Sequence, residues 1–100
     1  MPDYMILIHS DVPETGPDRS LEWGPYIAAL QASGNFQGGS AIGEGRCVRK
    51  SRPAGQLSER LAGYIRIQAD SLEHAQRLLN GNPGYEAGAT VEIRELPRTE

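Results

Sequence analysis

The order of hydrophobic patterns along the chain constrains its fold more than any other feature. Short apolar or alternating runs predict strands, whereas apolar residues spaced three or four apart predict helices. The patterns follow the order strand, helix, strand, strand, helix, strand. The predicted strands span 4–9, 36–45, 61–69 and 89–96, and the predicted helices span 20–33 and 70–80.

Two of the predicted strands alternate, which indicates that the sheet has one buried and one exposed face. The strands at 61–69 and 89–96 place apolar and polar residues on opposite sides. The first strand, Tyr4–His9, is almost wholly apolar and is predicted to be central in the sheet or buried on both faces. The exposed face would carry Tyr64, Arg66, Gln68, Thr90, Glu92 and Arg94.

With right-handed crossovers, this order of elements is the ferredoxin-like split βαβ arrangement, βαββαβ, of the α+β class. We therefore expect a four-stranded antiparallel sheet with two helices on one face. The other face would be covered by a second copy of the sheet, which gives a closed dimer with two-fold symmetry.

The ends of the two helices carry their own signals. Pro25 fits only the first turn of a helix, so the regular helix begins next to it or follows a short turn. Gly34-Asn35 provides a left-handed stop. Asp70, with Glu73 three residues later, predicts a capping box at the start of the second helix, which ends before Gly81.

The middle of the chain is rich in small and basic residues. The glycines of 36–45 suit a strand that another backbone or a ligand approaches closely. Residues 46–50 are predicted to continue as an exposed strand, and 51–58 to form a hairpin loop. The basic residues there are Arg46, Arg49, Lys50 and Arg52. No aromatic residue interleaves with them, so a solvated hairpin is favoured over a nucleic-acid site.

The size and charge of the chain limit the classes of function. A length of 100 residues suits a single domain, 1–100. A net charge of −3 argues against binding to nucleic acid or to an anionic membrane. The longest apolar run near the N-terminus, Met5–Ile8, is far too short for a membrane span, so we expect a soluble cytoplasmic protein. A domain this small buries only about two-thirds of its unfolded surface, which favours a homodimer.

No pattern in the sequence predicts a metal site or a cofactor. His9, Cys47 and His74 lie on three separate elements and lack the spacing of metal ligands. The single cysteine also excludes an intrachain disulfide. The segment 43–45 lacks the third glycine of a dinucleotide fingerprint and leads into a charged strand instead of a helix.

The chain resembles the YCII-related superfamily, small proteins that form dimeric α+β barrels. Three groups of residues carry the resemblance: Tyr4–Ile8 with Asp11 and Pro13; Trp23 with 30–34 and 38–42; and 61–65 with 70–75, Asn82-Pro83 and 88–94. The resemblance implies a ferredoxin-like subunit that dimerises through its sheet and has a cleft beside the helices.

The resemblance also bears on chemistry. Some relatives carry a His–Asp pair proposed as acid–base residues, and a few act on lactone-like or chlorinated aromatic degradation products. Asp11 matches the aspartate beyond the first strand, whereas Trp23 stands where such relatives have histidine. Asn82 stands where an aspartate precedes the proline. The chain is also similar to the DGPF branch, but it lacks the Asp-Gly-Pro-Phe signature.

The candidate site residues come from several predicted elements. His9 ends the first strand and Asp11 follows it, a pair suited to general acid–base chemistry. Trp23 on the apolar stripe of its helix is most simply a core anchor, and a pocket wall is the second reading. Small residues would let a ligand approach the backbone. The predicted ligand-binding residues are Trp23, Tyr26, Gly39, Ser40 and Asn82.

These features leave three functions open. The first is a homodimer that binds a small polar or aromatic metabolite in a cleft. The second is an enzyme of lyase, isomerase or dehalogenase type, with His9 as base and Asp11 as its orienting partner. The third is a non-catalytic dimerising module that influences a partner protein.

Overall fold

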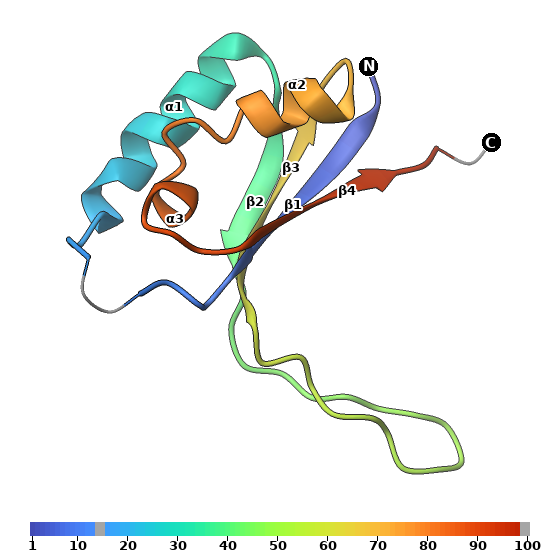
Figure 1. Ribbon diagram of the computed structural model, residues 1–100. Helices are drawn as coiled ribbons and strands as arrows, with labels where there is room; N and C mark the ends of the chain where they lie inside the picture. Colours follow the sequence, from blue (N-terminus) through green and yellow to red (C-terminus); the bar gives the residue numbers. More distant parts are fainter. Residues whose placement is uncertain (14–15, 99–100) are drawn as a thin grey trace.

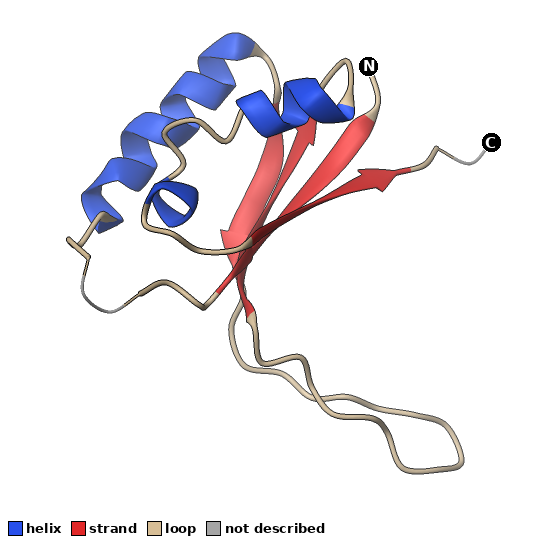
Figure 2. Ribbon diagram, viewed as in Figure 1, coloured by secondary structure: helices blue, strands red, loops and turns tan. Residues whose placement is uncertain are grey.

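The computed structural model describes residues 1–13 and 16–98 and contains one four-stranded antiparallel sheet with helices on one face (Figures 1 and 2). The strands are β1 (Asp3–His9), β2 (Phe36–Ala41), β3 (Leu61–Gln68) and β4 (Val91–Leu96). The helices are η1 (Ser20–Glu22), α1 (Trp23–Ser33), α2 (Leu72–Arg77) and α3 (Pro83–Glu86). The strand order β2-β3-β1-β4 confirms the ferredoxin-like α+β fold and places β1 inside the sheet.

The core lies between the sheet and the helices. Side chains of β1 alternate between buried and half-buried, and Ile6 is paired between Ile65 of β3 and Ile93 of β4. Leu30 of α1 and Leu79, which follows α2, pack onto this face of the sheet. The predicted alternation of β3 is therefore confirmed, with its isoleucines directed to the core.

The first helix begins and ends as the sequence predicts. The short 3-10 turn η1 precedes α1, so Pro25 falls in the first turn of the regular helix. Gly34 follows the helix with a φ of 80°, the left-handed conformation that glycine adopts without steric cost. Its backbone N–H donates to the carbonyl oxygen of Gln31.

The predicted capping box of the second helix is wrong, because the helix begins one residue later. Ser71 is the N-cap, and its hydroxyl oxygen accepts from the backbone N–H of His74 at 3.1 Å. His74 Nδ1 in turn accepts from the backbone N–H of Asp70 at 3.0 Å. The imidazole of His74 thus accepts the hydrogen bond from Asp70 that the capping box assigned to Glu73. His74 is half-buried at the start of α2.

A third helix, α3, was not predicted. Asn82 precedes it in an extended conformation, and its Oδ1 accepts from the backbone N–H of Tyr85 at 3.0 Å. Pro83 occupies the first helical position, where its missing N–H costs nothing. The Asn-Pro pair therefore starts a short helix, where the sequence analysis placed only the end of α2.

The strand predicted for 36–45 is shorter than expected, and the exposed strand predicted for 46–50 does not form. β2 ends at Ala41, and residues 42–60 form the loop that joins it to β3. Residues 43–58, which we call the arm, project away from the rest of the molecule (Figure 1). Glycine-rich backbone with few apolar side chains gains little from strand pairing, which explains the early end of β2.

No helix within residues 1–13 and 16–98 is long and apolar enough to cross a membrane.

Candidate functional site

A pocket of about 410 Å³ lies between α1 and one end of the sheet. On the helix side it is bounded by Trp23 and Ile27, one turn apart on α1. Small residues on β2 and β3 leave the space open on the sheet side. The lining residues are Ile8, Trp23, Ile27, Ser40, Ala41, Ala62, Gly63, Tyr64 and Ile65. The lining is thus mainly apolar, and it includes two of the predicted site residues, Trp23 and Ser40.

The indole of Trp23 is held by packing on two sides. Its ring meets the Tyr26 ring edge to face, with centroids 6.1 Å apart and an interplanar angle of 78°. On α3, a Cβ at Gly84 would lie 2.9 Å from Ile8 Cγ2 and 4.0 Å from Trp23 Cζ2, so this glycine allows α3 to pack closely. The indole wall of the pocket therefore lies against Tyr26 and close to α3.

Gly39 and Ser40 have different surroundings. A Cβ at Gly39 would lie 2.6 Å from the backbone oxygen of Tyr64, so glycine is needed there for the close approach of β2 to β3. Ser40 lines the pocket, and its hydroxyl donates to the carbonyl oxygen of Ala41 at 2.8 Å. In β2, Gly39 thus allows close packing of the backbone, whereas Ser40 lines the pocket.

Tyr26 and Asn82 lie in the interior. The phenol of Tyr26 donates to the carbonyl oxygen of Leu78 at 2.8 Å, and burial raises the pKa of this phenol. Asn82 is fully buried, with an exposed fraction of 0%, and its side chain caps α3. Both were predicted to line the cleft, but in the structure they make their contacts within the core.

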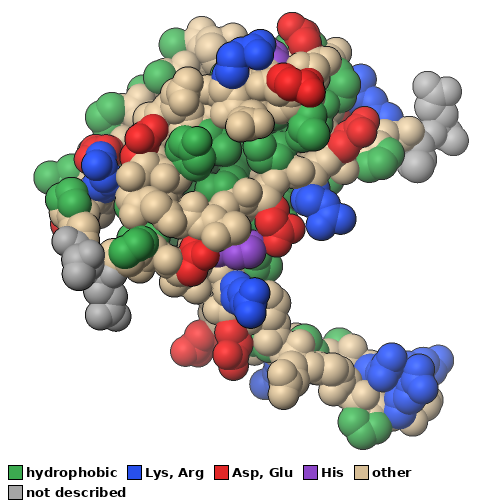
Figure 3. Space-filling view, viewed as in Figure 1, with side chains coloured by type: hydrophobic (Ala, Val, Ile, Leu, Met, Phe, Trp, Pro, Cys, Tyr) green, Lys and Arg blue, Asp and Glu red, His purple; other side chains and the backbone are tan. Residues whose placement is uncertain are grey.

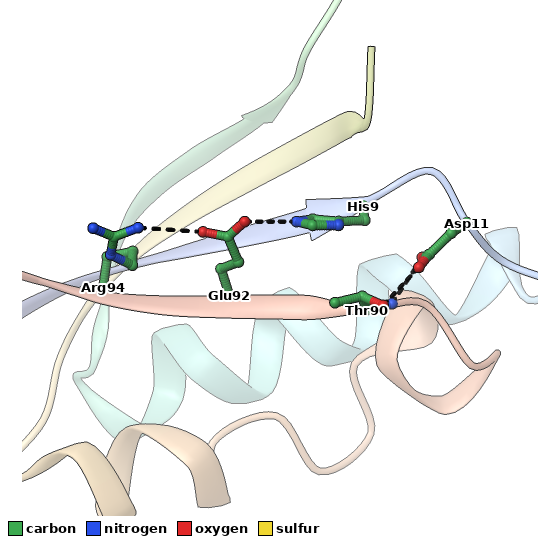
Figure 4. Close-up of polar contacts among 5 residues, drawn as sticks. All are labelled: His9, Asp11, Thr90, Glu92 and Arg94. Carbon is green, nitrogen blue, oxygen red and sulfur yellow. Dashed lines mark hydrogen bonds and ion pairs between the residues drawn. The ribbon is translucent and has the colours of Figure 1, made fainter. Parts of the chain in front are cut away.

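His9 lies on the sheet face away from the helices, beside Glu92 of β4 (Figure 4). Its Nε2 is 2.9 Å from Glu92 Oε1, and Glu92 Oε2 accepts from Arg94 at 3.5 Å. The hydrogen bond with His9 is the main cause that lowers the pKa of the Glu92 carboxyl. The three side chains form a polar row, Arg94–Glu92–His9, across β1 and β4.

Asp11 binds Thr90 and not His9, so the expected orientation of His9 by Asp11 is wrong. Its two carboxylate oxygens accept from the Thr90 backbone N–H at 2.8 Å and from the Thr90 hydroxyl at 2.6 Å. These two hydrogen bonds, first the hydroxyl and then the amide, lower the pKa of Asp11. Glu92, which the sequence analysis counted only as a polar face residue, supplies the carboxylate partner of His9.

The predicted cleft is thus divided among three places: the pocket with Trp23 and Ser40, the open face with His9, and the core with Tyr26 and Asn82. Within the part of the chain that the structure describes, no group of three or more His, Cys, Asp or Glu side chains could hold a metal ion.

Comparison with known proteins identifies a similar fold. No protein-family model and no curated protein matches the chain. Among solved structures it is similar to 5-chloro-2-hydroxyhydroquinone dehydrochlorinase from Burkholderia phenoliruptrix AC1100, in complex with 2,5-dihydroxybenzoquinone. The TM-score is 0.62 at 14% sequence identity, over 97% of this chain and 95% of that chain. The similarity extends over the whole domain, and at this identity it shows the shared α+β fold alone.

Proposed function

We propose that this chain binds a small aromatic compound in the pocket beneath Trp23 and acts as a homodimer. The observation that carries the proposal is the apolar pocket of about 410 Å³, walled by the only tryptophan of the chain. This volume is within the range of small-molecule sites, which are mainly apolar with a few polar groups. An indole face favours a planar ring, so an aromatic ligand fits better than a strongly polar one.

The structural neighbour supports an aromatic ligand. Its name gives a chlorinated hydroxyhydroquinone as substrate, and its complex holds a dihydroxybenzoquinone. We infer that the present chain belongs to the same broad group, the YCII-related superfamily, and takes a ring compound of comparable size. The motifs 4–8, 30–34 and 88–94 support this inference.

The open sheet face supports the homodimer. In its central row Leu7 of β1 is paired between Tyr64 of β3 and Glu92 of β4, and in the next row Met5 is paired between Arg66 and Arg94. Apolar side chains thus form the middle of this face, with polar groups on both sides. A second copy of the same face would bury the apolar column and leave the polar groups at its margin, as in other two-fold interfaces.

Ligand binding can be measured through the fluorescence of Trp23. We expect 2,5-dihydroxybenzoquinone, the probe, to quench it saturably in the parent protein. Ala41→Phe would fill the pocket from β2 and weaken this binding by at least about tenfold, which corresponds to 1.4 kcal/mol. Ala32→Phe places the same ring on exposed helix surface and is expected to bind as the parent does. Equal binding by Ala41→Phe and the parent would contradict the pocket.

A second candidate function, acid–base catalysis, is favoured by the 2.9 Å contact between His9 and Glu92. A carboxylate that holds one imidazole nitrogen leaves the other free to move a proton. In the proposed dimer this pair would lie at the margin of the interface, beside the apolar column of β1. His9 would act as the base, and Glu92 would position it in place of Asp11.

Chloride release from 5-chloro-2-hydroxyhydroquinone tests this candidate. His9→Ala and Glu92→Gln are expected to lower the rate by about 10²–10⁴-fold, the usual contribution of a general base. Glu95→Gln, an exposed carboxylate on the same strand, is the control and should leave the rate unchanged. Full activity in His9→Ala would refute the base, and a parent protein with no activity would refute this substrate class.

The variant His9→Ala can also be tested through the titration of Glu92. Because its pKa is lowered in the folded protein by His9, the carboxylate stabilises the fold at neutral pH and loses this effect as the pH falls through its folded pKa. In His9→Ala the pKa of Glu92, followed by NMR, is expected to rise. The stability difference between the two proteins should then disappear at low pH.

A further inference from the structure

The arm, residues 43–58, contains no buried or half-buried residue. Each of its sixteen residues is exposed, and it extends from the end of β2 and β3 into solvent (Figure 1). The radius of gyration of 15.1 Å exceeds the value of about 13 Å typical of a compact 100-residue domain. Loops longer than about 12–15 residues without secondary structure are uncommon, and they are usually either functional segments or linkers and disordered segments. A segment of this kind gains a defined position only through contact with another molecule.

The arm combines positive charge with exposed apolar side chains. It carries four basic residues and one acidic residue, a net charge of +3, which leaves −6 on the rest of the chain. Figure 3 shows the basic side chains gathered at its far end. Val48, with an exposed fraction of 83%, lies among Arg46, Arg49 and Lys50, and Leu57 is exposed further along the arm.

An apolar groove of about 310 Å³ lies between α2, α3 and the edge strand β4. Two of its large apolar side chains, Leu72 and Tyr85, have exposed fractions of 50% and 42%. Figure 3 shows apolar side chains gathered in this region with acidic groups around them. The groove is lined by Leu72, Gln76, Leu79, Tyr85, Ala89, Val91 and Ile93.

The groove belongs to an acidic part of the chain. Residues 69–96, which provide its lining, contain five acidic and two basic residues, a net charge of −3. Glu73 follows Leu72 on α2, Glu86 follows Tyr85 on α3, and Glu95 lies on the edge strand. The charge of this region is thus opposite and equal to that of the arm, and both carry exposed large apolar residues.

We propose that the arm of one subunit docks in this groove on a second copy of the chain. Val48 would contact Leu72 and Tyr85, and the arginines beside it would lie near the carboxylates of α2, α3 and β4. The arm cannot reach its own groove in this conformation, because it points away from the helices (Figure 2). The inference rests on the proposed homodimer and adds to it a second contact outside the sheet faces. Opposite charges on the arm and the groove would favour this orientation of the arm and increase the rate of association.

A photocrosslink from the arm tests the proposal directly. Cys47, the only cysteine, is exposed beside Val48 and accepts a maleimide-linked benzophenone without further mutation. Labelled protein is mixed with an excess of heavy-isotope protein in which Cys47 is replaced by serine, allowed to exchange subunits, irradiated and digested. We expect crosslinks from the arm to heavy-isotope peptides that contain residues 72–79 or 85–93. Crosslinks only to light peptides of its own subunit would overturn the proposal.

Charge and apolar variants of the arm separate specific docking from other contacts. Arg46→Glu with Arg49→Glu, or Val48→Asp, should reduce the crosslink yield by at least about fivefold. Leu21→Asp, at a residue that is 92% exposed elsewhere, should not change it. Unchanged yields in the arm variants would overturn the proposal, as would retention of a labelled RNA or DNA oligonucleotide that the double variant abolishes.

Light scattering on the unlabelled protein distinguishes two kinds of failure. A mass near 10.9 kDa would reject both the dimer and the arm contact. A dimer whose arm crosslinks miss the groove would reject only the arm contact.

Discussion

Replacing Asn82 by aspartate is expected to destabilise the fold by roughly 4 kcal/mol at pH 7. The side chain is fully buried, and its Oδ1 accepts the backbone N–H of Tyr85, which a carboxylate oxygen could do equally well. The substitution therefore keeps the shape of the side chain and its cap of α3, and the main change is a buried negative charge. Burial of this degree raises a carboxyl pKa by about three units or more, at 1.36 kcal/mol for each unit. Since small domains have a stability of about 5–15 kcal/mol, the loss would be a large share of the total.

The pH dependence identifies this mechanism. A carboxyl with a raised folded pKa keeps its proton in the native state while the unfolded chain releases it, so stability falls as the pH rises above about 4. The loss should be small near pH 3.5 and grow until the folded pKa is reached. Urea unfolding at several pH values measures it. Asn80→Asp, on exposed surface two residues earlier, is the control. A constant difference at all pH values would show that packing, not charge, causes the loss.

Leu7→Lys is expected to dissociate the proposed dimer while the subunit stays folded. Leu7 lies at the centre of the open sheet face, between Tyr64 and Glu92. In the isolated subunit the new ammonium group would be exposed and opposite the carboxylate of Glu92, a favourable cross-strand pair. Against a second copy it would lose its water, at a cost of several kcal/mol. We expect the dissociation constant to rise by about 100-fold or more.

Light scattering with circular dichroism measures both parts of this expectation. The parent should have about twice the subunit mass of 10.9 kDa, and Leu7→Lys should have the subunit mass with an unchanged far-ultraviolet spectrum. Leu21→Lys places the same charge at a highly exposed residue on η1 and should remain dimeric. A dimer that persists in Leu7→Lys would show that the copies associate through another surface.

Local patterns in the sequence were sufficient for the four strands, for α1 and α2, and for the order of these six elements, but not for α3. Alternation in 61–69 and 89–96 identified β3 and β4, and Pro25 and Gly34 marked the ends of α1 to within a few residues. These signals depend on a side chain and its near neighbours along the chain, through backbone conformation and periodicity. The topology then followed, because right-handed crossovers leave few ways to combine two helices and four strands.

Local patterns gave a wrong N-cap for α2, because two neighbouring residues can both cap a helix. Asp70 and Ser71 are both good N-caps, and only the backbone conformation decides that Ser71 caps α2. The strand predicted for 46–50 failed for a different reason. The composition of the arm permits an exposed strand, but the arm buries too little apolar surface to stabilise one. The helix pattern placed Trp23 toward the core, and the family resemblance implied a cleft beside the helices. The volume of the pocket depends on the small residues that β2 and β3 present to it.

The sequence alone therefore determined the α+β fold and the polar and apolar faces of the strands. Tertiary structure decided which distant side chains meet: Glu92 with His9, and Thr90 with Asp11. The physical reason is strand register. The contact between β1 and β4 joins residues 83 positions apart, and periodicity says which face a residue occupies but not which residue of another strand lies opposite.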